Sequence, residues 1–202
     1  NVILQCEEGY YIADDEELDA YVNGAKAYIS AQDGNRTTLT VGYSVPVASG
    51  VHGQVVSFCD GSDVTVSLFA DGSAESKYTV SVPGGTKDSS GQYTTTYDIP
   101  GVAPGTYTMQ VSKKNHVTRE YTVTVSGDAV TQDVKIHLKG DINGDGKVTT
   151  IDFVRVNSHA RGVTLLSGYE LKCADVVGTD GKVTTADAIR INAHAKGTSL
   201  LW

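Results

Sequence analysis

A segment near the end of the chain occurs twice, and this repeat constrains the fold more than any other feature. Residues 140–162 read GDINGDGKVTTIDFVRVNSHARG, and residues 178–197 read GTDGKVTTADAIRINAHAKG. The copies align from Gly146 onto Gly181, with GKVTT identical and Arg, Asn, His and Gly matched further along. A match of this length indicates two copies of one structural unit, each too small to bury a core alone.

The first copy opens with oxygen-bearing side chains at the spacing of an EF-hand calcium loop. They fall at positions 1, 3, 5 and 12, and a glycine stands at position 6. Ca²⁺ takes about 6–8 oxygen ligands, and a loop of this length supplies them because alternate side chains point inward while the glycine makes the turn. The predicted ligands are Asp141, Asn143, Asp145, the Lys147 carbonyl, a water held near Thr149, and Asp152.

The second copy departs from this spacing at its start. Counting back from Gly181 places Val176 at position 1, and Asp175 lies one residue too early. Either the loop has 13 residues, with Asp175 as first ligand and a backbone carbonyl near Val177 or Gly178 replacing a missing side chain, or the site no longer binds. We favour the longer loop, with a lower affinity because fewer ligands are charged. Its predicted ligands are Asp175, Asp180, the Lys182 carbonyl and Asp187.

Each loop leads into one predicted helix, the first starting at Thr150 and ending at Gly162 as a C-cap. No helix leads into the first loop, because the strand-like residues DVKIHLKG precede it. An EF-hand has helices on both sides of its loop, whereas a duplicated unit of one loop and one helix resembles a type I-like dockerin. The resemblance covers residues 139–202. It implies two antiparallel helices, two bound Ca²⁺ ions, and binding to a cohesin module of a scaffoldin in a secreted, extracellular or cell-surface complex (a cellulosome) that degrades plant polysaccharide.

The apolar residues of this segment are few for its size, so we expect calcium binding to be coupled to folding. The expected core comprises Phe153, Val156, Ala160, Leu165, Leu166, Leu171, Ala188, Ile191, Ala195, Leu200 and Leu201.

The opposite face of each helix carries apolar residues beside an arginine, at helical spacing. It is either a partner surface or, through Val154 and Ile189, a completion of the core. By the dockerin resemblance, the cohesin-binding residues are Thr150, Ile151, Val154, Arg155 and Ser158 in the first copy, and Thr185, Ala186, Ile189, Arg190 and Ala193 in the second. Many dockerins carry Ser-Thr where this chain has Thr-Ile and Thr-Ala, which leaves the cohesin type open. Because the copies are alike, a partner could dock either way round.

Histidines occupy equivalent places on the two predicted helices, at His159 and His194. They are too far from the loop oxygens to be calcium ligands, and calcium seldom binds nitrogen. Partner contacts and packed polar groups both remain open as their role.

The rest of the chain is predicted to hold an N-terminal segment and a mainly-β sandwich. Residues 1–47 contain one expected helix, which follows an acidic first turn and ends near Gly34, and could form part of an X module. Between residues 48 and 138, short Val-, Thr- and Tyr-rich runs alternate with turn signals, which is typical of an Ig-like β-sandwich. The stretch YDIPGVAPGTYTMQV resembles the carboxypeptidase-regulatory, or transthyretin-like, sandwich. We expect the sandwich to be a spacer or stabiliser that docks against the dockerin.

Composition and motifs argue against several other functions. Residues 1–138 carry 8 Lys/Arg and 17 Asp/Glu, and residues 139–202 carry 8 and 7, so neither part has the basic character of a nucleic-acid binder. No apolar run has the length of a membrane span. The scattered Cys6, Cys59 and Cys173 suggest no zinc site or disulfide framework, and Cys59 and Cys173 are expected to be buried.

No motif of an enzyme is found, so we expect a non-catalytic protein that is monomeric when free. The alternative is a sandwich that itself binds carbohydrate or protein, with the calcium segment as its cap.

Overall fold

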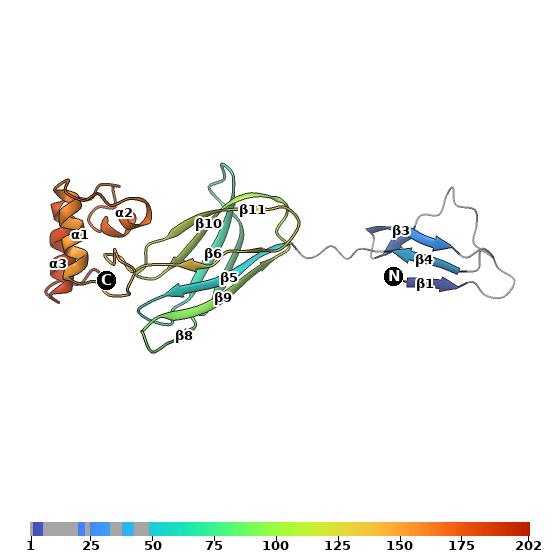
Figure 1. Cartoon of the computed structure of the whole chain (residues 1–202), viewed down its shortest axis with the longest axis horizontal. Helices are drawn as coiled ribbons and strands as arrows, with labels where there is room; N and C mark the ends of the chain where they lie inside the picture. Colours follow the sequence, from blue (N-terminus) through green and yellow to red (C-terminus); the bar gives the residue numbers. More distant parts are fainter. Residues whose placement is uncertain (1, 6–19, 23–24, 33–37, 43–48) are drawn as a thin grey trace. The chain divides into compact units, whose positions relative to one another are not determined.

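The computed structural model describes residues 2–5, 20–22, 25–32, 38–42 and 49–202 (Figure 1). The chain forms two compact units, residues 1–46 and 47–202. The first unit contains a four-stranded antiparallel sheet in the order β1-β4-β3-β2. Its strands are β1 (Val2–Gln5), β2 (Ala20–Val22), β3 (Ala25–Gln32) and β4 (Thr38–Gly42).

The helix expected in this unit is wrong where the structure describes the region. β2 and β3 pair as an antiparallel hairpin, with Val22 opposite Ala25. Asn23-Gly24 stands between them in the sequence, and this dipeptide favours a two-residue hairpin loop more strongly than the helical spacing favours a helix. The acidic residues 14–17, residues 23–24, Gly34 and Cys6 lie outside the described residues.

The second unit begins with two β-sheets. One has the strand order β11-β10-β6-β7, and the other has the order β12-β5-β9-β8 with β13 also beside β5. Neighbouring strands are antiparallel except β12 and β13, which run parallel to β5. The strands are β5 (Gly50–Ser57), β6 (Val64–Ala70), β7 (Ser76–Val82), β8 (Thr86–Lys87), β9 (Tyr93–Pro100), β10 (Gly105–Lys113), β11 (Arg119–Val125), β12 (Val130–Thr131) and β13 (Val134–Lys135).

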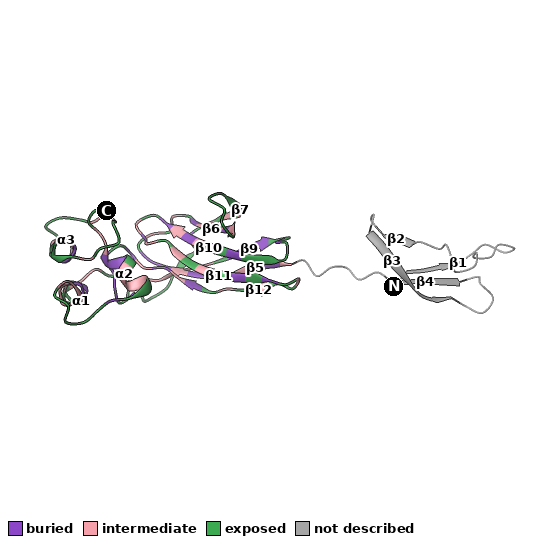
Figure 2. Ribbon diagram, turned by 90° about the horizontal axis from the view of Figure 1, so that it is seen from above, coloured by how far each residue is buried: buried purple, intermediate pink, exposed green. Residues whose placement is uncertain are grey.

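Side chains from both sheets form one core, and the predicted β-sandwich is confirmed. Buried and less buried residues alternate along β6 and β10, as expected for strands with one face covered (Figure 2). Leu68 and Met109 are fully buried in one sheet, and they share a hydrophobic cluster with Val51 and Val55 of the other.

Residues 139–202, which hold both copies and are called the repeated segment below, fold into three helices. These are α1 (Thr150–Ala160), α2 (Gly168–Ala174) and α3 (Thr185–Ala195). The predicted helices α1 and α3 lie side by side (Figure 1), and the short helix α2 between them was not predicted. None of the described helices is long and apolar enough to cross a membrane. The fully or largely buried core residues are Ile142, Val156, Leu166, Ala174, Ala188 and Ile191, with Phe153, Leu171 and Leu201 partly buried against them.

Three residues expected inside the protein are at its surface. Leu165 is 72% exposed and Leu200 is 61% exposed, because their neighbours Leu166 and Leu201 turn inward instead. Cys59 is exposed at a turn with φ of 76°, whereas Cys173 is buried as expected.

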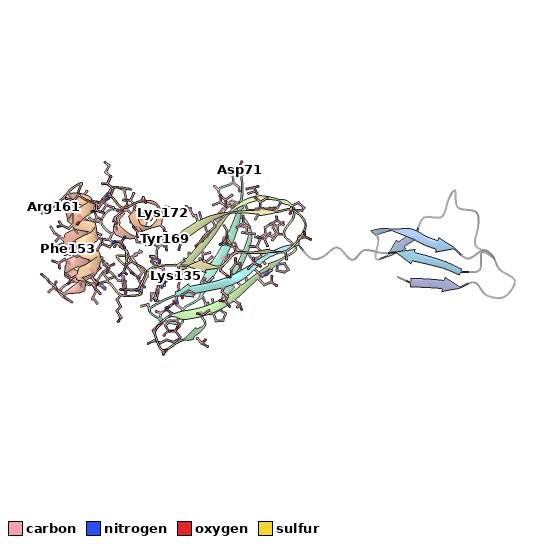
Figure 3. All side chains as sticks on the ribbon, viewed as in Figure 1. Asp71, Lys135, Phe153, Arg161, Tyr169 and Lys172 are labelled. Carbon is pink, nitrogen blue, oxygen red and sulfur yellow. The ribbon has the colours of Figure 1, made fainter. Side chains whose placement is uncertain are left out.

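The helical part packs against the sandwich through α2. The Tyr169 hydroxyl donates to the Val117 carbonyl (2.5 Å) and accepts from the His137 N–H (3.1 Å). The Arg119 guanidinium lies 4.6 Å from the Tyr169 ring centroid, and Lys172 pairs with Glu120 at 2.6 Å. Figure 3 shows Tyr169 and Lys172 on the side of α2 that faces the sandwich. The sandwich and the repeated segment therefore form one compact unit.

A buried histidine lies close to this junction. The Nε2 atom of His116 accepts from the Phe58 N–H (3.0 Å), so the ring proton is on Nδ1, which donates to the Lys114 carbonyl (2.7 Å). Burial lowers the pKa of His116 from 6.5 to about 4. The folded protein therefore holds this ring neutral.

We predict that His116 makes the sandwich less stable in acid. Between pH 6.5 and 4 the unfolded chain binds a proton at His116 that the folded chain does not, so the free energy of unfolding falls as the pH drops through this window. The loss should reach about 3 kcal/mol. Urea unfolding followed by amide signals of β10 measures it. His116→Gln should flatten the pH dependence, whereas His52→Gln, which removes only a surface contact to Thr131, should not. An unchanged slope in His116→Gln would contradict the prediction.

Candidate functional site

The first predicted ligand, Asp141, is fully buried and holds the turn of the first loop together. Its Oδ1 accepts from the N–H groups of Gly144 (2.8 Å) and Asp145 (3.2 Å), and its Oδ2 accepts from that of Gly146 (2.9 Å). Gly146 has φ of 83°, the left-handed conformation that glycine adopts readily. The sequence thus places a buried carboxylate at the centre of the loop.

Asp152 joins the start of the same loop to the helix that follows it. Its Oδ1 accepts from the Ile142 N–H (2.9 Å) and its Oδ2 from the Thr149 N–H (2.8 Å). Thr149 is the N-cap of α1, and its hydroxyl accepts from the Ile151 N–H (3.2 Å). Thr149 and Asp152 also form a capping box, because each side chain accepts from the backbone N–H of the other residue. One carboxylate therefore both starts α1 and closes the loop.

The intermediate predicted ligands are also turned towards the loop. The Oδ1 atom of Asn143 accepts from the Asp145 N–H (3.1 Å), and that of Asp145 accepts from the Lys147 N–H (2.9 Å). Both side chains are exposed at the rim, unlike Asp141 and Asp152. All four predicted side chains of the first loop thus accept hydrogen bonds from backbone amides of that loop.

The second loop repeats the two main contacts with a different count of residues. Asp187 Oδ1 accepts from the Val176 and Val177 N–H groups (3.0 and 2.9 Å), as Asp152 does from Ile142 and Asn143. Asp175 Oδ2 accepts from the Gly181 N–H (2.8 Å), as Asp141 Oδ2 does from Gly146. Asp175 therefore occupies the position of Asp141, as expected for a second loop of 13 residues that starts at Asp175.

The insertion changes what surrounds Asp175. The turn contains Thr179 with a positive φ of 46°, and Val177 takes the place of Asn143, so this position has no side-chain oxygen. The Oδ1 atom of Asp175 is buried and has no hydrogen-bond partner. Asp180 keeps the role of Asp145, because it accepts from the Lys182 N–H at 3.0 Å. The carboxylate of Asp175 therefore accepts fewer hydrogen bonds from its loop than the carboxylate of Asp141 does.

The charge on these carboxylates is not balanced by basic side chains. Asp141, Asp152 and Asp187 are buried, yet the ion pairs between Lys or Arg and carboxylates among the described residues are Arg155–Glu170 and Lys172–Glu120. Burial and the nearby charge of Asp152 raise the pKa of Asp141 to about 6, against its hydrogen bonds from backbone amides. Buried carboxylates without a basic partner favour binding of a cation, and a set of oxygen donors suits Ca²⁺.

Side chains alone do not complete a site. In the part of the chain that the structure describes, no group of three or more Asp, Glu, His or Cys residues is placed to hold a metal ion. Calcium loops also draw on amide oxygens, backbone carbonyls and water, and in this chain those would come from Asn143 and from the Lys147 and Lys182 carbonyls.

The outer faces of α1 and α3 are exposed. Val154 is 53% exposed and Ile189 is 68% exposed, so the reading in which they complete the core is wrong. Ile151, Thr150, Thr185 and Ala186 are exposed beside them, and Ser158 and Ala193 are half-buried. The predicted partner residues therefore lie on two matching surfaces.

The two arginines of these surfaces are bound within the chain. Arg155 pairs with Glu170 of α2 (2.7 Å), and Arg190 donates to the Leu200 carbonyl (2.7 Å) and contacts the Ser199 hydroxyl. The exposed part of each face is therefore mainly apolar. Leu165 and Leu200, which were expected in the core, are exposed on the segments that follow the two helices.

The two equivalent histidines are packed polar groups. His159 Nδ1 accepts from the Leu166 N–H, and His194 Nδ1 accepts from the Leu201 N–H, both at 2.9 Å. Each histidine thus holds the backbone that follows its helix, and Leu166 and Leu201 turn towards the core.

Comparisons with known proteins agree with the repeated loop and helix. Residues 139–194 match the family model described as the dockerin type I domain. The search of curated proteins gave no match.

The chain is also similar to two crystal structures of type II cohesin–X-dockerin complexes from Acetivibrio cellulolyticus, one with a mutant N-terminal interface and one with a mutant C-terminal interface. Sequence identity is 17% and 16%, the TM-score is 0.32 for both, and each match covers 71% of this chain and 92% of the other.

The predicted resemblance of the C-terminal segment to dockerins is therefore confirmed, over residues 139–194, by the match to the dockerin type I domain.

Proposed function

We propose that the repeated segment is a calcium-dependent cohesin-binding module that attaches its parent protein to an extracellular scaffoldin of a plant-polysaccharide-degrading complex. In this proposal residues 139–202 form the dockerin, residues 48–138 the adjacent sandwich, and residues 1–47 a further segment. The observation that carries the proposal is the pair of loop–helix units, which place equivalent carboxylates in two loops and equivalent apolar residues on two exposed helix faces.

Calcium would be held by the oxygen atoms of the two loops. In the first loop these belong to Asp141, Asn143, Asp145, the Lys147 carbonyl, a water near Thr149, and Asp152. In the second they belong to Asp175, Asp180, the Lys182 carbonyl and Asp187. The ion would supply positive charge to carboxylates that have no basic partner, and the Asp175 Oδ1 atom, buried without a hydrogen bond, supports a ligand role for this residue.

The cohesin would bind the outer faces of α1 and α3. The centre of a protein interface is more apolar than the rest of the surface, and the exposed Val154 and Ile189 hold equivalent places on the two helices. Because Arg155 and Arg190 are engaged within the chain, apolar contact rather than charge would drive the binding. The likeness of the faces supports docking in either of two orientations.

The sandwich would act as a non-catalytic neighbour that stabilises the module. The Tyr169 hydrogen bonds and the Lys172–Glu120 pair fix α2 to strand β11 and its surroundings. A binding role for the sandwich itself is the second candidate. It is favoured by a surface hollow of about 400 Å³, lined by His52, Gly53, Gln54, Thr96, Tyr97, Thr131 and Asp133. Within this hollow, the Tyr97 hydroxyl already donates to the Gln132 carbonyl, and His52 bonds to Thr131.

We predict that removal of calcium unfolds the repeated segment and leaves the sandwich folded. Without the ion, the buried carboxylates would lose the charge that balances them, whereas the sandwich core is built from apolar side chains. Amide NMR spectra in calcium and in EDTA measure the effect for each part separately. Unchanged signals for residues 141–197 in EDTA would rule out the coupling.

We predict that cohesin binding survives loss of either helix face but not of both. Val154→Asp and Ile189→Asp each place a charge at an exposed position, so neither should disturb folding. Each variant should bind with little change, because the partner would use the other orientation, and the double variant should lose at least about 30-fold in affinity. Pull-downs and titrations against a panel of cohesins, with and without EDTA, measure this, with Thr122→Asp on the sandwich as control.

If one single variant alone abolishes binding, the two-way docking is wrong. If no cohesin binds but a carbohydrate or another protein does, the second candidate replaces the first.

A further inference from the structure

We propose that the sandwich is part of the first calcium site: Phe58 and His137 hold the turn of the first loop in place, so that this loop binds its ion more tightly and releases it more slowly than the second. The inference rests on the proposed calcium function. It assigns a positioning role to two residues outside the repeated segment.

The glycines of the first loop lie directly against these two side chains. A Cβ atom added at Gly146 would lie 2.2 Å from Cδ1 of Phe58, and one added at Gly144 would lie 2.4 Å from Nε2 of His137. Both distances are too short for real atoms, so only glycine allows this approach. The backbone of the turn is therefore in close contact with the sandwich.

The same turn carries the amides that orient Asp141. The N–H groups of Gly144 and Gly146 both donate to its carboxylate, at 2.8 and 2.9 Å. A side chain that fixes the two glycines therefore also fixes the first ligand, although it touches no ligand oxygen itself. Interactions of this indirect kind orient metal ligands and tune affinity.

Phe58 is well suited to this role because its own backbone is held firmly. Its N–H donates to His116 Nε2 (3.0 Å), and its carbonyl accepts from Lys113 Nζ (3.3 Å). The side chain is only 2% exposed, yet it belongs to neither hydrophobic core cluster. Its burial therefore comes from the junction with the loop, with the Lys135 ammonium 5.5 Å from its ring centroid.

The second loop has no such support. Gly178 and Gly181 have φ of 80° like the glycines of the first loop, but nothing lies within 4 Å of a Cβ atom added at either position. Asp175 accepts one amide hydrogen bond from the turn, where Asp141 accepts three. Calcium must therefore order more of the second loop, which costs conformational entropy and weakens binding.

Calcium binding to the two loops can be measured separately in the whole protein. The amide signals of Gly146 and Gly181 report the loops during a calcium titration, and stopped-flow mixing with a fluorescent chelator gives the release rates. Phe58→Ala should raise the dissociation constant of the first loop by about 10-fold or more and speed its release. The second loop should not change. Phe58→Leu should recover part of the affinity, and Glu120→Gln, which removes the Lys172 ion pair at the same junction, should leave the first loop as it is.

A matched pair of glycine variants tests the contact independently of Phe58→Ala. Gly146→Ala and Gly181→Ala face the same positive φ, of 83° and 80°, but only the first adds a Cβ atom that meets Phe58. Gly146→Ala should therefore weaken its loop more than Gly181→Ala weakens the other, and Phe58→Ala combined with Gly146→Ala should remove that difference.

The outcomes separate this inference from the function on which it rests. Calcium binding to both loops with equal affinities, or equal weakening of both loops by Phe58→Ala, would overturn the role of the sandwich and leave the calcium function standing. Absence of calcium binding at both loops would overturn both. Loss of sandwich amide signals in Phe58→Ala would show that the residue serves the sandwich fold, and would also overturn the inference.

Discussion

Buried carboxylates without basic partners are the constraint on which the helical part of this protein depends. Asp152 and Asp187 each accept hydrogen bonds from the start of a loop and from the N-cap of the helix that follows. They thereby set where α1 and α3 begin and how each loop closes. Removing such charges from water costs free energy unless an opposite charge lies nearby, and calcium is the cation that this set of oxygen donors suits.

The duplication gives the repeated segment two similar helix faces, whereas contact with the sandwich and an insertion make its two loops different. Val154 and Ile189 keep the two outer faces alike, so a partner would meet nearly the same surface in two orientations. The loops differ, because one lies against Phe58 and the other carries an insertion next to Thr179. Recognition by the faces and ion binding by the loops are therefore under different structural control.

The sequence predicts the local structure of the repeat well and its contacts poorly. The loop spacing and the helix ends follow from short-range chemistry, and the spacing of the second copy already predicts the displaced position of Asp175. The sequence of a Leu-Leu pair does not reveal which member turns inward. Leu166 rather than Leu165 does so here, because its N–H donates to His159. The helix predicted near the N-terminus is wrong because the Asn23-Gly24 hairpin signal outweighs the helical spacing of the apolar residues around it. Helix α2 and the contact of Phe58 with the first loop depend on the distant sandwich, which no local pattern reports.

A crystal structure of the protein grown with calcium, with anomalous data collected, tests the account most directly. It should show one ion in each loop, the first about 2.3–2.6 Å from oxygens of Asp141, Asn143, Asp145 and Asp152, and the second beside Oδ1 of Asp175. Loops that stay closed on their own backbone amides, with no ion at millimolar calcium, would contradict it.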